Sequence, residues 1–424
     1  MRPSTLLFPV ISLLLSCVVS TTSAEPAAQQ EFDLDGLIES AMQQSATLEF
    51  AQSALDASRI SEKSLPWWDA PEIRLGYGRD AAVSDRFKSA NYPNHDYDTS
   101  LRFFPKNPWE HKAQRRQLQA DSRLQELYSK EVELEITRGI TELYWEAGYT
   151  HSELKLRNQL KSIYQEQVDG MEKLLEVSQI TLAGSLAAKM KLLNLRVESE
   201  TLQRNYNNLI GQLGMLCNVD PSTIKLSEIL QLSDSSFDLP YTTWKNNALS
   251  ARPDAERYSV LVEKAQADLS VIKASQQPWI KFVQFSYSAE NDYGEQDTAG
   301  IEIAFDLPFF ASDGGQKEIA SNMERSHRKQ EVFGRQMIEL EVRSLIEEFK
   351  ALQRQWQTQG KLIDSMQTEL SSAIDKMKTQ GNHANRDYLD ARITLLELEL
   401  KQLELCKSFQ DLQIKRMQIL GQDS

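Results

Sequence analysis

The sequence is poor in cysteine, proline and glycine. Its 424 residues include 3 cysteines, 13 prolines and 17 glycines. Beyond Cys17 only Cys217 and Cys406 remain, too few for the disulfide framework of a small exported domain, and we expect both to be half-buried apolar residues on helices. Little proline and glycine, with abundant leucine, glutamine, glutamate, lysine and alanine, favours long helices and coiled coils over ordinary globular domains.

Long apolar runs and an excess of positive charge are also missing. No segment after the N-terminal region reaches ~18 uninterrupted apolar residues, so we expect no transmembrane helix. If the chain meets a membrane, it must do so through strands. The net charge of −14 argues against nucleic acid as a partner and against simple adhesion to anionic lipid.

The patterns that carry catalysis or metal binding are not present. The 5 histidines are scattered, and none pairs with another at the spacing of a metal-binding helix. There is no G-x-S-x-G, P-loop or dinucleotide-binding fingerprint. Asn94 to Asp98 could contact a cation, but we favour a solvated loop there. The sequence therefore predicts no catalytic residue, no metal site and no cofactor.

The N-terminus resembles an export signal. Arg2 is the only charge in the first 24 residues, an apolar stretch follows it, and small residues end at Ala24. This pattern predicts a secretory signal peptide over residues 1–24. Lipidation at Cys17, which follows a lipobox-like Leu-Leu-Ser, stays open as the alternative to cleavage after Ala24.

The remaining chain is an internal duplication. Ala41 corresponds to Ala248 and Pro71 to Pro278, both 207 residues on, and after one length change the offset is 203, where Pro105 corresponds to Pro308. Such self-similarity indicates two copies of one structural unit. We assign residues 25–230 and 231–424 to two repeats, each a helix, a strand pair and a long helical hairpin.

The strand pairs have the pattern of amphipathic β-hairpins. Apolar residues alternate with Glu302, Ala304 and Asp306 between residues 301 and 307, and the partner strand runs from about Trp279 to Ala289. Residues 72–79 and 97–104 form the corresponding pair of the first repeat. Each strand has the length that a tilted membrane strand needs. A soluble hairpin packed on helices is the alternative.

Four such strands cannot close a barrel by themselves. An open sheet would leave unpaired backbone groups in lipid, so closure requires several copies of the chain. In that case Glu302 and Asp306 line the lumen, where acidic rings favour cations. Otherwise these carboxylates lie on a solvated strand face.

Long helices account for most of the rest. No proline occurs between Pro108 and Pro221, and a helix from Glu110 to about Val177 would span ~100 Å. Heptad-like steps continue afterwards at Leu186, Met190, Leu193 and Val197. The last helix carries two apolar stripes, as a helix with two neighbours in a tube wall requires: Ile393, Leu396, Leu400 and Leu403 form one, and Leu398, Leu405, Phe409, Leu412 and Ile419 form the other. A single broad stripe in a bundle is the alternative.

Two turns join these helices, and they carry a family resemblance. Gly381-x-x-Ala384-x-x-Asp387-Tyr388-Leu389 resembles the Gly-x-x-Ser-x-x-Asp-Leu-Leu turn of the outer-membrane efflux proteins of the TolC type. The first turn is a divergent copy of it, with Ser178, Thr181 and Gly184. The segment from Ile303 to Phe310 and the Leu-Cys-Asn-Val-Asp-Pro sequence ending at Pro221 are also similar to motifs of that family, so the resemblance covers nearly all of the chain after the signal.

The resemblance implies a homotrimer in the outer membrane of a Gram-negative cell. Four strands from each copy would build a 12-stranded barrel in outer-membrane lipid, continued by a helical tube, or α-barrel, into the periplasm. The turns would form the periplasmic tip, where Thr181, Gly381, Ala384 and Asp387 would dock a periplasmic adaptor protein and an inner-membrane pump. The implied function is a passive conduit of a tripartite efflux or type I secretion system.

Two other functions stay open. A periplasmic adaptor protein of an export machine has one helical hairpin between β-domains, which the duplication argues against. A periplasmic coiled-coil scaffold would explain the helices alone. The strand end near Leu307 also resembles the heavy-metal branch of the family; the cargo itself follows from the pump and not from this chain.

Overall fold

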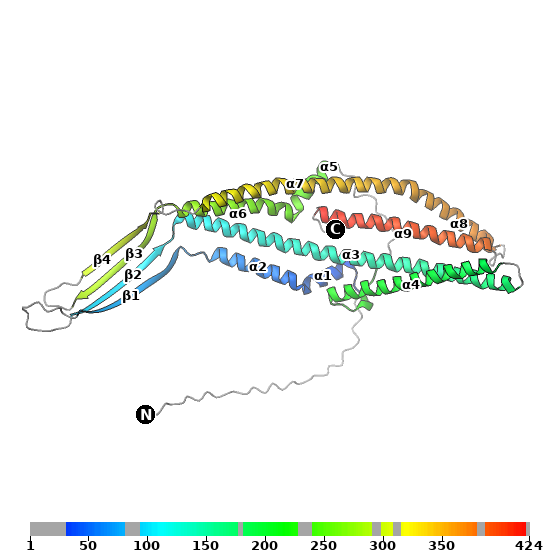
Figure 1. The fold of residues 1–424 in the computed structure, drawn as a ribbon, viewed down its shortest axis with the longest axis horizontal. Coiled ribbons are helices and arrows are strands. Elements are labelled where there is room, and N and C mark those ends of the chain that lie inside the picture. Colours follow the sequence, from blue (N-terminus) through cyan, green and yellow to red (C-terminus); the bar gives the residue numbers. More distant parts are fainter. Residues whose placement is uncertain are drawn as a thin grey trace, which may run out of the picture.

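The computed structural model describes residues 31–80, 94–176, 181–227, 240–290, 298–307, 315–379 and 386–420. The signal region, with Cys17, lies outside these residues, as do Gly381 and Ala384. Figure 1 shows an elongated molecule with one sheet at one end and helices along the rest of its length. None of the described helices is long and apolar enough to cross a lipid bilayer.

The elements follow the same order in each half of the chain. In the first half they are α1 (Leu34–Gln44), α2 (Ala46–Lys63), β1 (Trp68–Asp80), β2 (Asn94–Pro105), α3 (Pro108–Glu176), α4 (Leu182–Cys217) and the short 3-10 helix η1 (Pro221–Thr223). In the second half they are α5 (Tyr241–Ala251), α6 (Pro253–Ser275), β3 (Trp279–Glu290), β4 (Thr298–Asp306), α7 (Gln316–Gln355), the π-helical turn η3 (Trp356–Gly360), α8 (Lys361–Thr379) and α9 (Arg386–Leu420).

Proline placement and capping set the ends of the long helices. The 69-residue α3 begins at Pro108, where the missing N–H of proline is not needed, and continues to Glu176, which confirms the predicted helix within two residues. Helix α4 ends at Asn218, which takes a left-handed conformation with φ of 50°. A Cβ atom on Gly214 would come within 2.9 Å of the Pro221 ring, so only glycine permits this tight exit.

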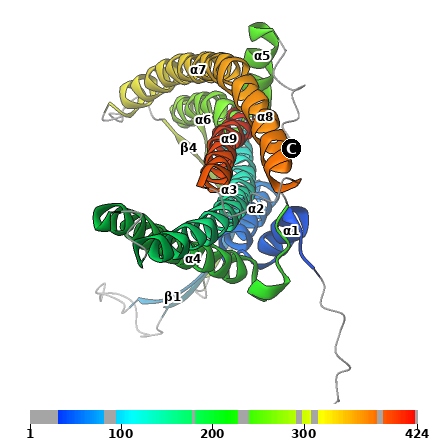
Figure 2. The ribbon, with the colours of Figure 1, turned by 90° about the vertical axis from the view of Figure 1, so that its right-hand side faces the viewer.

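The helices form a curved layer four columns wide. Helices α2 and α4 lie one after the other along one edge, α3 is next, α6 and α9 follow it, and α7 with α8 forms the far edge. Figure 2 looks along the helices and shows this layer as an arc, with α1 and α5 on its convex side.

Equivalent residues of the two halves fill equivalent core positions. Leu37 of α1 and Trp244 of α5 are both buried, as are Ala41 and Ala248 one turn later. The first pair packs with residues of α3 and α4, and the second with residues of α7 and α9. Burial of each large side chain contributes roughly 1.5–3 kcal/mol, so these short helices fasten the middle of the arc.

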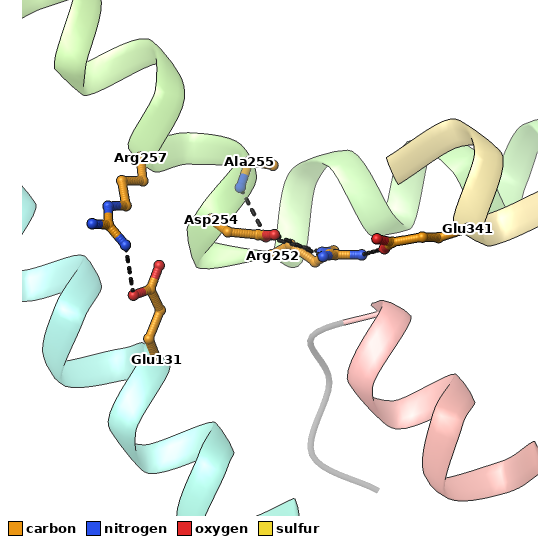
Figure 3. Close-up of polar contacts among 6 residues, drawn as sticks. All are labelled: Glu131, Arg252, Asp254, Ala255, Arg257 and Glu341. Atoms are coloured by element: carbon orange, nitrogen blue, oxygen red, sulfur yellow. Dashed lines mark hydrogen bonds and ion pairs between the residues drawn. The ribbon is translucent and has the colours of Figure 1, made fainter. Parts of the chain in front are cut away.

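A polar cluster joins the junction between α5 and α6 to α3 and to α7 (Figure 3). The Arg252 guanidinium donates to Asp254 at 2.7 Å and to Glu341 of α7 at 2.5 Å, while Arg257 donates to Glu131 of α3 at 3.2 Å. Burial disfavours the Arg252 cation, yet the hydrogen bonds to Asp254 and Glu341 keep its pKa above the usual value. The cluster therefore fixes the α5–α6 junction between α3 and α7.

Helix α9 uses both of its apolar stripes on different partners. Ile393 and Leu396 pack in a cluster with residues of α3 and α4, and Leu403 faces Trp145 of α3. On the other side Leu398 and Leu405 pack against Ile363 of α8, and Phe409, Leu412 and Ile419 join the cluster around α5 and α7. The expectation of two neighbours is confirmed, and the single broad stripe of a bundle is wrong.

The heptad positions of α4 do not form a seam within the chain. Leu186, Met190, Leu193 and Val197 are each at least half exposed, whereas the residues buried against α3 are Leu192 and Leu195. The sequence predicted the stripe but not its partner, because an apolar stripe does not say which chain covers it. On α4 the predicted seam is a free edge of the arc.

The sheet is a four-stranded antiparallel meander in the order β1-β2-β3-β4. Bulges interrupt the register between Asp69 and Glu72 on β1 and between Ile280 and Phe282 on β3. Figure 1 shows the sheet projecting beyond the helices, so the alternative of hairpins packed on helices is wrong. The solvated loop expected over Asn94 to Asp98 is also wrong, since all these residues pair with β1 and the last three also pair with β3.

Candidate functional site

One face of the sheet is polar over most of its described length and is apolar only next to the helices, where Phe104, Phe282 and Ala304 lie on it. The register places Glu72, Arg102, Gln284 and Glu302 opposite one another, one on each strand. The next rows on this face are Arg74, Ser100, Ser286 and Gly300, and then Gly76, Asp98, Ser288 and Thr298. Because strand side chains alternate between faces, these rows form one continuous polar surface.

Arg102 is the best-held charge of this polar face. Its Nε donates to Gln284 Oε1 at 2.8 Å, and its Nη1 lies 4.0 Å from Glu72. The guanidinium carbon also lies 4.1 Å from the centre of the Phe282 ring, in cation–π geometry. Only 16% of the Arg102 side chain is exposed. The residue therefore links the hairpin of the first half to that of the second.

The opposite face of the sheet is apolar and uncovered. Its rows include Ile73, Leu101, Phe285 and Ile301, and then Leu75, Thr99, Tyr287 and Ala299. The side chain of Leu75 is 79% exposed and that of Ile301 is 69% exposed. Such a contiguous apolar surface is rare on proteins surrounded by water and marks a membrane or protein contact.

Aromatic residues border this apolar face at both ends. Trp67, Trp68, Trp109 and Trp279 gather where the strands meet the helices; Trp67 stacks on His111 at 3.8 Å, and the rings of Trp109 and Trp279 lie 5.7 Å apart. Tyr77, Tyr97 and Tyr287 lie near the far end, with Tyr77 and Tyr97 at 5.4 Å. Paired girdles of this kind flank the lipid band of membrane strands.

These aromatic borders were not predicted from the sequence. The signal was available in the spacing, since Trp68 precedes Tyr77 by nine residues on β1. At about 3.3 Å per residue and a tilt of about 40°, nine residues cover roughly 23 Å of bilayer depth. That depth is close to the apolar band of an outer-membrane strand.

The predicted acidic residues of the sheet lie on β4. Glu302 is opposite Gln284 on the polar face, and Asp306 follows on the same face at the end next to the helices. Both are exposed, and the Lys281 ammonium lies 4.0 Å from the Asp306 carboxylate. The structure therefore brings both residues to the polar face, together with Glu72 and Arg102, which sequence reasoning did not single out.

The described tip residues lie at the end of the molecule opposite the sheet. Thr181 caps α4, with its Oγ1 accepting from the Gly184 N–H at 3.3 Å, and Asp387 lies in the first turn of α9. Figure 1 places the start of α4 and the start of α9 at this same end. Tyr388 and Leu389, which follow Asp387, are buried in a cluster with residues of α3 and α4.

Polar contacts also connect the two helical hairpins near the tip. Gln167 of α3 donates to Asp390 of α9 at 3.2 Å, and Arg392 donates to Glu166 at 3.4 Å. These groups are exposed, so each contact contributes about 1 kcal/mol or less. At the tip the hairpins are therefore held together by a buried apolar cluster and by weak polar contacts at its surface.

The two cysteines within the described residues are free and buried on helices, Cys217 at the end of α4 and Cys406 in α9. Burial raises the pKa of the Cys217 thiol to about 11, so it is neither a nucleophile nor a metal ligand at neutral pH. Across the described residues no group of three or more His, Cys, Asp or Glu side chains is placed to hold a metal ion.

Comparison with known proteins gives no match in sequence, either to a protein family or to a curated protein. Solved structures do match. VceC, an outer membrane protein of Vibrio cholerae, superposes with a TM-score of 0.71 at 19% identity, covering 92% of this chain and 96% of VceC. The CmeC outer membrane channel of Campylobacter jejuni gives a TM-score of 0.68 at 14% identity, covering 99% of this chain and 94% of CmeC.

The chain has the TolC-type fold. CusC, a protein that forms a transmembrane channel, is similar as well, with a TM-score of 0.69 at 16% identity over 95% of this chain and 96% of CusC. The predicted fold class is thus confirmed: mainly helical, with duplicated long hairpins and four strands in one small sheet. The likeness to these structures does not confirm the heavy-metal branch.

Proposed function

We propose that this protein is the outer-membrane channel subunit of a tripartite efflux or type I secretion system. It acts as a passive homotrimeric conduit and catalyses no reaction. The observation that carries the proposal is the sheet, whose uncovered apolar face is bordered by aromatic girdles while its other face is polar over most of its length. A sheet of this kind is stable only with lipid on one side and water on the other.

The sheet also explains why several copies are needed. Strands β1 and β4 each pair on one side only, and every unpaired backbone group in lipid costs several kcal/mol. Pairing β1 of one copy with β4 of the next removes both edges. Three copies contribute twelve strands, a number within the range of single outer-membrane barrels.

Exposed apolar residues on the two edges of the helical arc support the same closure. Near the tip, α4 exposes Leu182, Leu186, Met190, Leu193 and Val197, and the opposite edge exposes Leu362 and Met366 of α8. Nearer the sheet, α2 exposes Phe50 and Ile60, and α7 exposes Ile319, Met323, Phe333, Met337 and Leu340. Each edge thus offers apolar partners at the matching height, which favours a tube built from three arcs.

The helical end is the proposed docking site for other components. The tube would extend into the periplasm, and its tip, formed by Thr181, Gly381, Ala384 and Asp387 of each copy, would meet the periplasmic adaptor protein and the inner-membrane pump. Energy comes from the pump. The adaptor opens the tip by separating the helical turns, and weak contacts such as Arg392 to Glu166 favour a closed state at rest.

Residues 1–24 would act as the signal peptide that directs export to the outer membrane. Processing would be either cleavage after Ala24 or lipidation at Cys17. The two repeats, residues 25–230 and 231–424, would then each contribute one strand pair and one hairpin to the wall. Mass spectrometry of the N-terminal peptide of the mature protein decides between the two kinds of processing.

Reconstitution into planar bilayers tests the proposal. The detergent-purified protein should behave as a trimer in light scattering and give stepwise ion conductance after insertion. A periplasmic scaffold instead stays soluble without detergent and leaves the bilayer silent. A monomer that needs no detergent and produces no conductance, even with the adaptor added, would falsify the channel assignment.

A further inference from the structure

The polar face of the sheet carries a fixed pair of arginines on neighbouring strands. Arg74 of β1 and Arg102 of β2 both contact Glu72, at 3.0 Å and 4.0 Å. Two guanidinium groups therefore share one carboxylate, which leaves one net positive charge in this part of the face. The pair lies on the hairpin of the first half of the chain.

Arg102 is held in place from several directions. Gln284 of β3 accepts from both Nε and Nη2 of its guanidinium, the Phe282 ring lies beneath it at 4.1 Å, and Glu72 lies beside it. An exposed arginine normally samples many rotamers, whereas a side chain held by three partners keeps its charge at one position. The charge therefore belongs to the wall and does not reach across the lumen.

The second hairpin carries the opposite charge on the same face. Glu302 and Asp306 lie on β4, separated from Arg102 by β3. Asp98 of β2 adds a carboxylate to this face, and the Lys281 ammonium lies 4.0 Å from Asp306. In a closed trimer the wall would thus carry the two arginines of each copy among more numerous carboxylates, and the balance of the two kinds of charge decides which ions pass.

The dimensions make these wall charges effective. Twelve strands spaced about 4.8 Å apart and tilted about 40° enclose a cylinder of backbone radius roughly 12 Å, and side chains narrow the open radius to about 7 Å. The Debye length is about 8 Å at 0.15 M salt. An ion on the axis therefore lies within about one Debye length of the wall charges at its own depth.

We infer that Arg102, supported by Arg74, is a selectivity-determining residue that keeps the channel permeable to anions against the acidic residues of β4. The inference rests on the proposed channel function. It differs from what a lumen lined by acidic residues alone would do, because such a pore would be strongly selective for cations. The natural balance of Arg102 and Glu302 keeps the potassium-to-chloride permeability ratio moderate.

Reversal potentials in a potassium chloride gradient across a planar bilayer test this role. Replacing Arg102→Gln removes one positive charge per copy, and we expect the potassium-to-chloride permeability ratio to rise roughly two- to fivefold near 0.1 M salt. Glu302→Gln should lower the ratio by a similar factor. Both effects should disappear near 1 M salt, where the Debye length is about 3 Å.

Control variants separate charge from structure. Arg102→Lys keeps the charge but loses the two-nitrogen contact with Gln284, and it should keep the natural ratio. Lys245→Gln removes a positive charge from α5, on the convex side of the arc, and should change nothing. An unchanged ratio in Arg102→Gln channels of normal conductance overturns the selectivity role alone, whereas no conductance in the natural protein overturns the channel itself.

Discussion

The ring of Tyr258 in α6 lies directly against Gly334 in α7. A Cβ atom on Gly334 would approach Tyr258 Cε2 to 2.3 Å, closer than carbon atoms can come. The glycine therefore sets the distance between these two helix columns. Because the interior offers little free volume, any side chain at this position must displace the ring or separate the helices.

Replacing Gly334→Ala should destabilise the protein in spite of alanine's better helix propensity. We expect overpacking to cost about 1–3 kcal/mol, more than the ~1 kcal/mol gained from propensity. Thermal unfolding followed by circular dichroism measures the difference. Gly139→Ala is the matched control, since no atom lies within 4 Å of its added Cβ, and it should be neutral or stabilising. Adding Tyr258→Leu to Gly334→Ala should restore much of the loss.

The burial of Glu399 makes the stability of the fold depend on pH. Burial raises the pKa of this carboxyl above its ordinary value of 4.5, so the folded state binds its proton more tightly than the unfolded state. Ionised Glu399 therefore destabilises the fold at neutral pH, and that penalty is absent below pH 4.5, where both states are protonated.

Glu399→Gln should accordingly raise the midpoint of thermal unfolding at pH 7. The gain should shrink as pH falls through the raised pKa and vanish below the ordinary one. Thermal melts of both proteins between pH 4 and pH 8 measure this, provided that the oligomeric state is constant. A gain of equal size at every pH would show that the amide improves packing and that ionisation plays no part.

The contacts between the two helical hairpins at the tip give a prediction about channel opening. Arg392→Ala together with Gln167→Ala removes the hydrogen bonds to Glu166 and Asp390. Two exposed contacts contribute about 1–2 kcal/mol, so the population of open channels should rise roughly five- to thirtyfold. Single-channel recordings without adaptor measure the open probability. Lys350→Ala, which removes an ion pair within α7, should leave it unchanged.

Long elements were predictable where one chemical rule decides them. The run without proline predicted α3 almost to the residue, and alternation predicted β3 and β4, because backbone preference and side-chain period are properties of the segment itself. Asn94 to Asp98 were misassigned since their strand depends on partners from β1 and β3. Pairing of this kind cannot be seen in the segment alone.

The candidate site was only partly predictable for the same reason. Glu302 and Asp306 follow from alternation on one strand. The role of Arg102 depends on the register that sets Glu72 and Gln284 beside it, and these three residues are far apart in the sequence. The stripe at Leu186 and Leu193 was visible, but an apolar period reports that a partner exists and not that it lies in another copy.

That stripe leads to a direct test of assembly. Leu186 and Leu193 of α4 are 51% and 53% exposed in the single chain, and burial in a trimer would stabilise each contact by roughly 1.5–3 kcal/mol. Leu186→Asp with Leu193→Asp places two charges per copy in the proposed interface. We expect the trimer to dissociate in detergent, which light scattering measures directly.

The same variants separate assembly from folding. Both side chains point away from the chain's own core, so the far-ultraviolet circular dichroism of the monomers should stay as helical as that of the natural protein. Asn205→Asp adds a charge to an exposed position elsewhere on α4 and should leave the trimer intact. If the double variant remains trimeric and conducts normally, the α4 stripe is not the contact between copies, and the edge-to-edge closure of the helical arcs must use another surface.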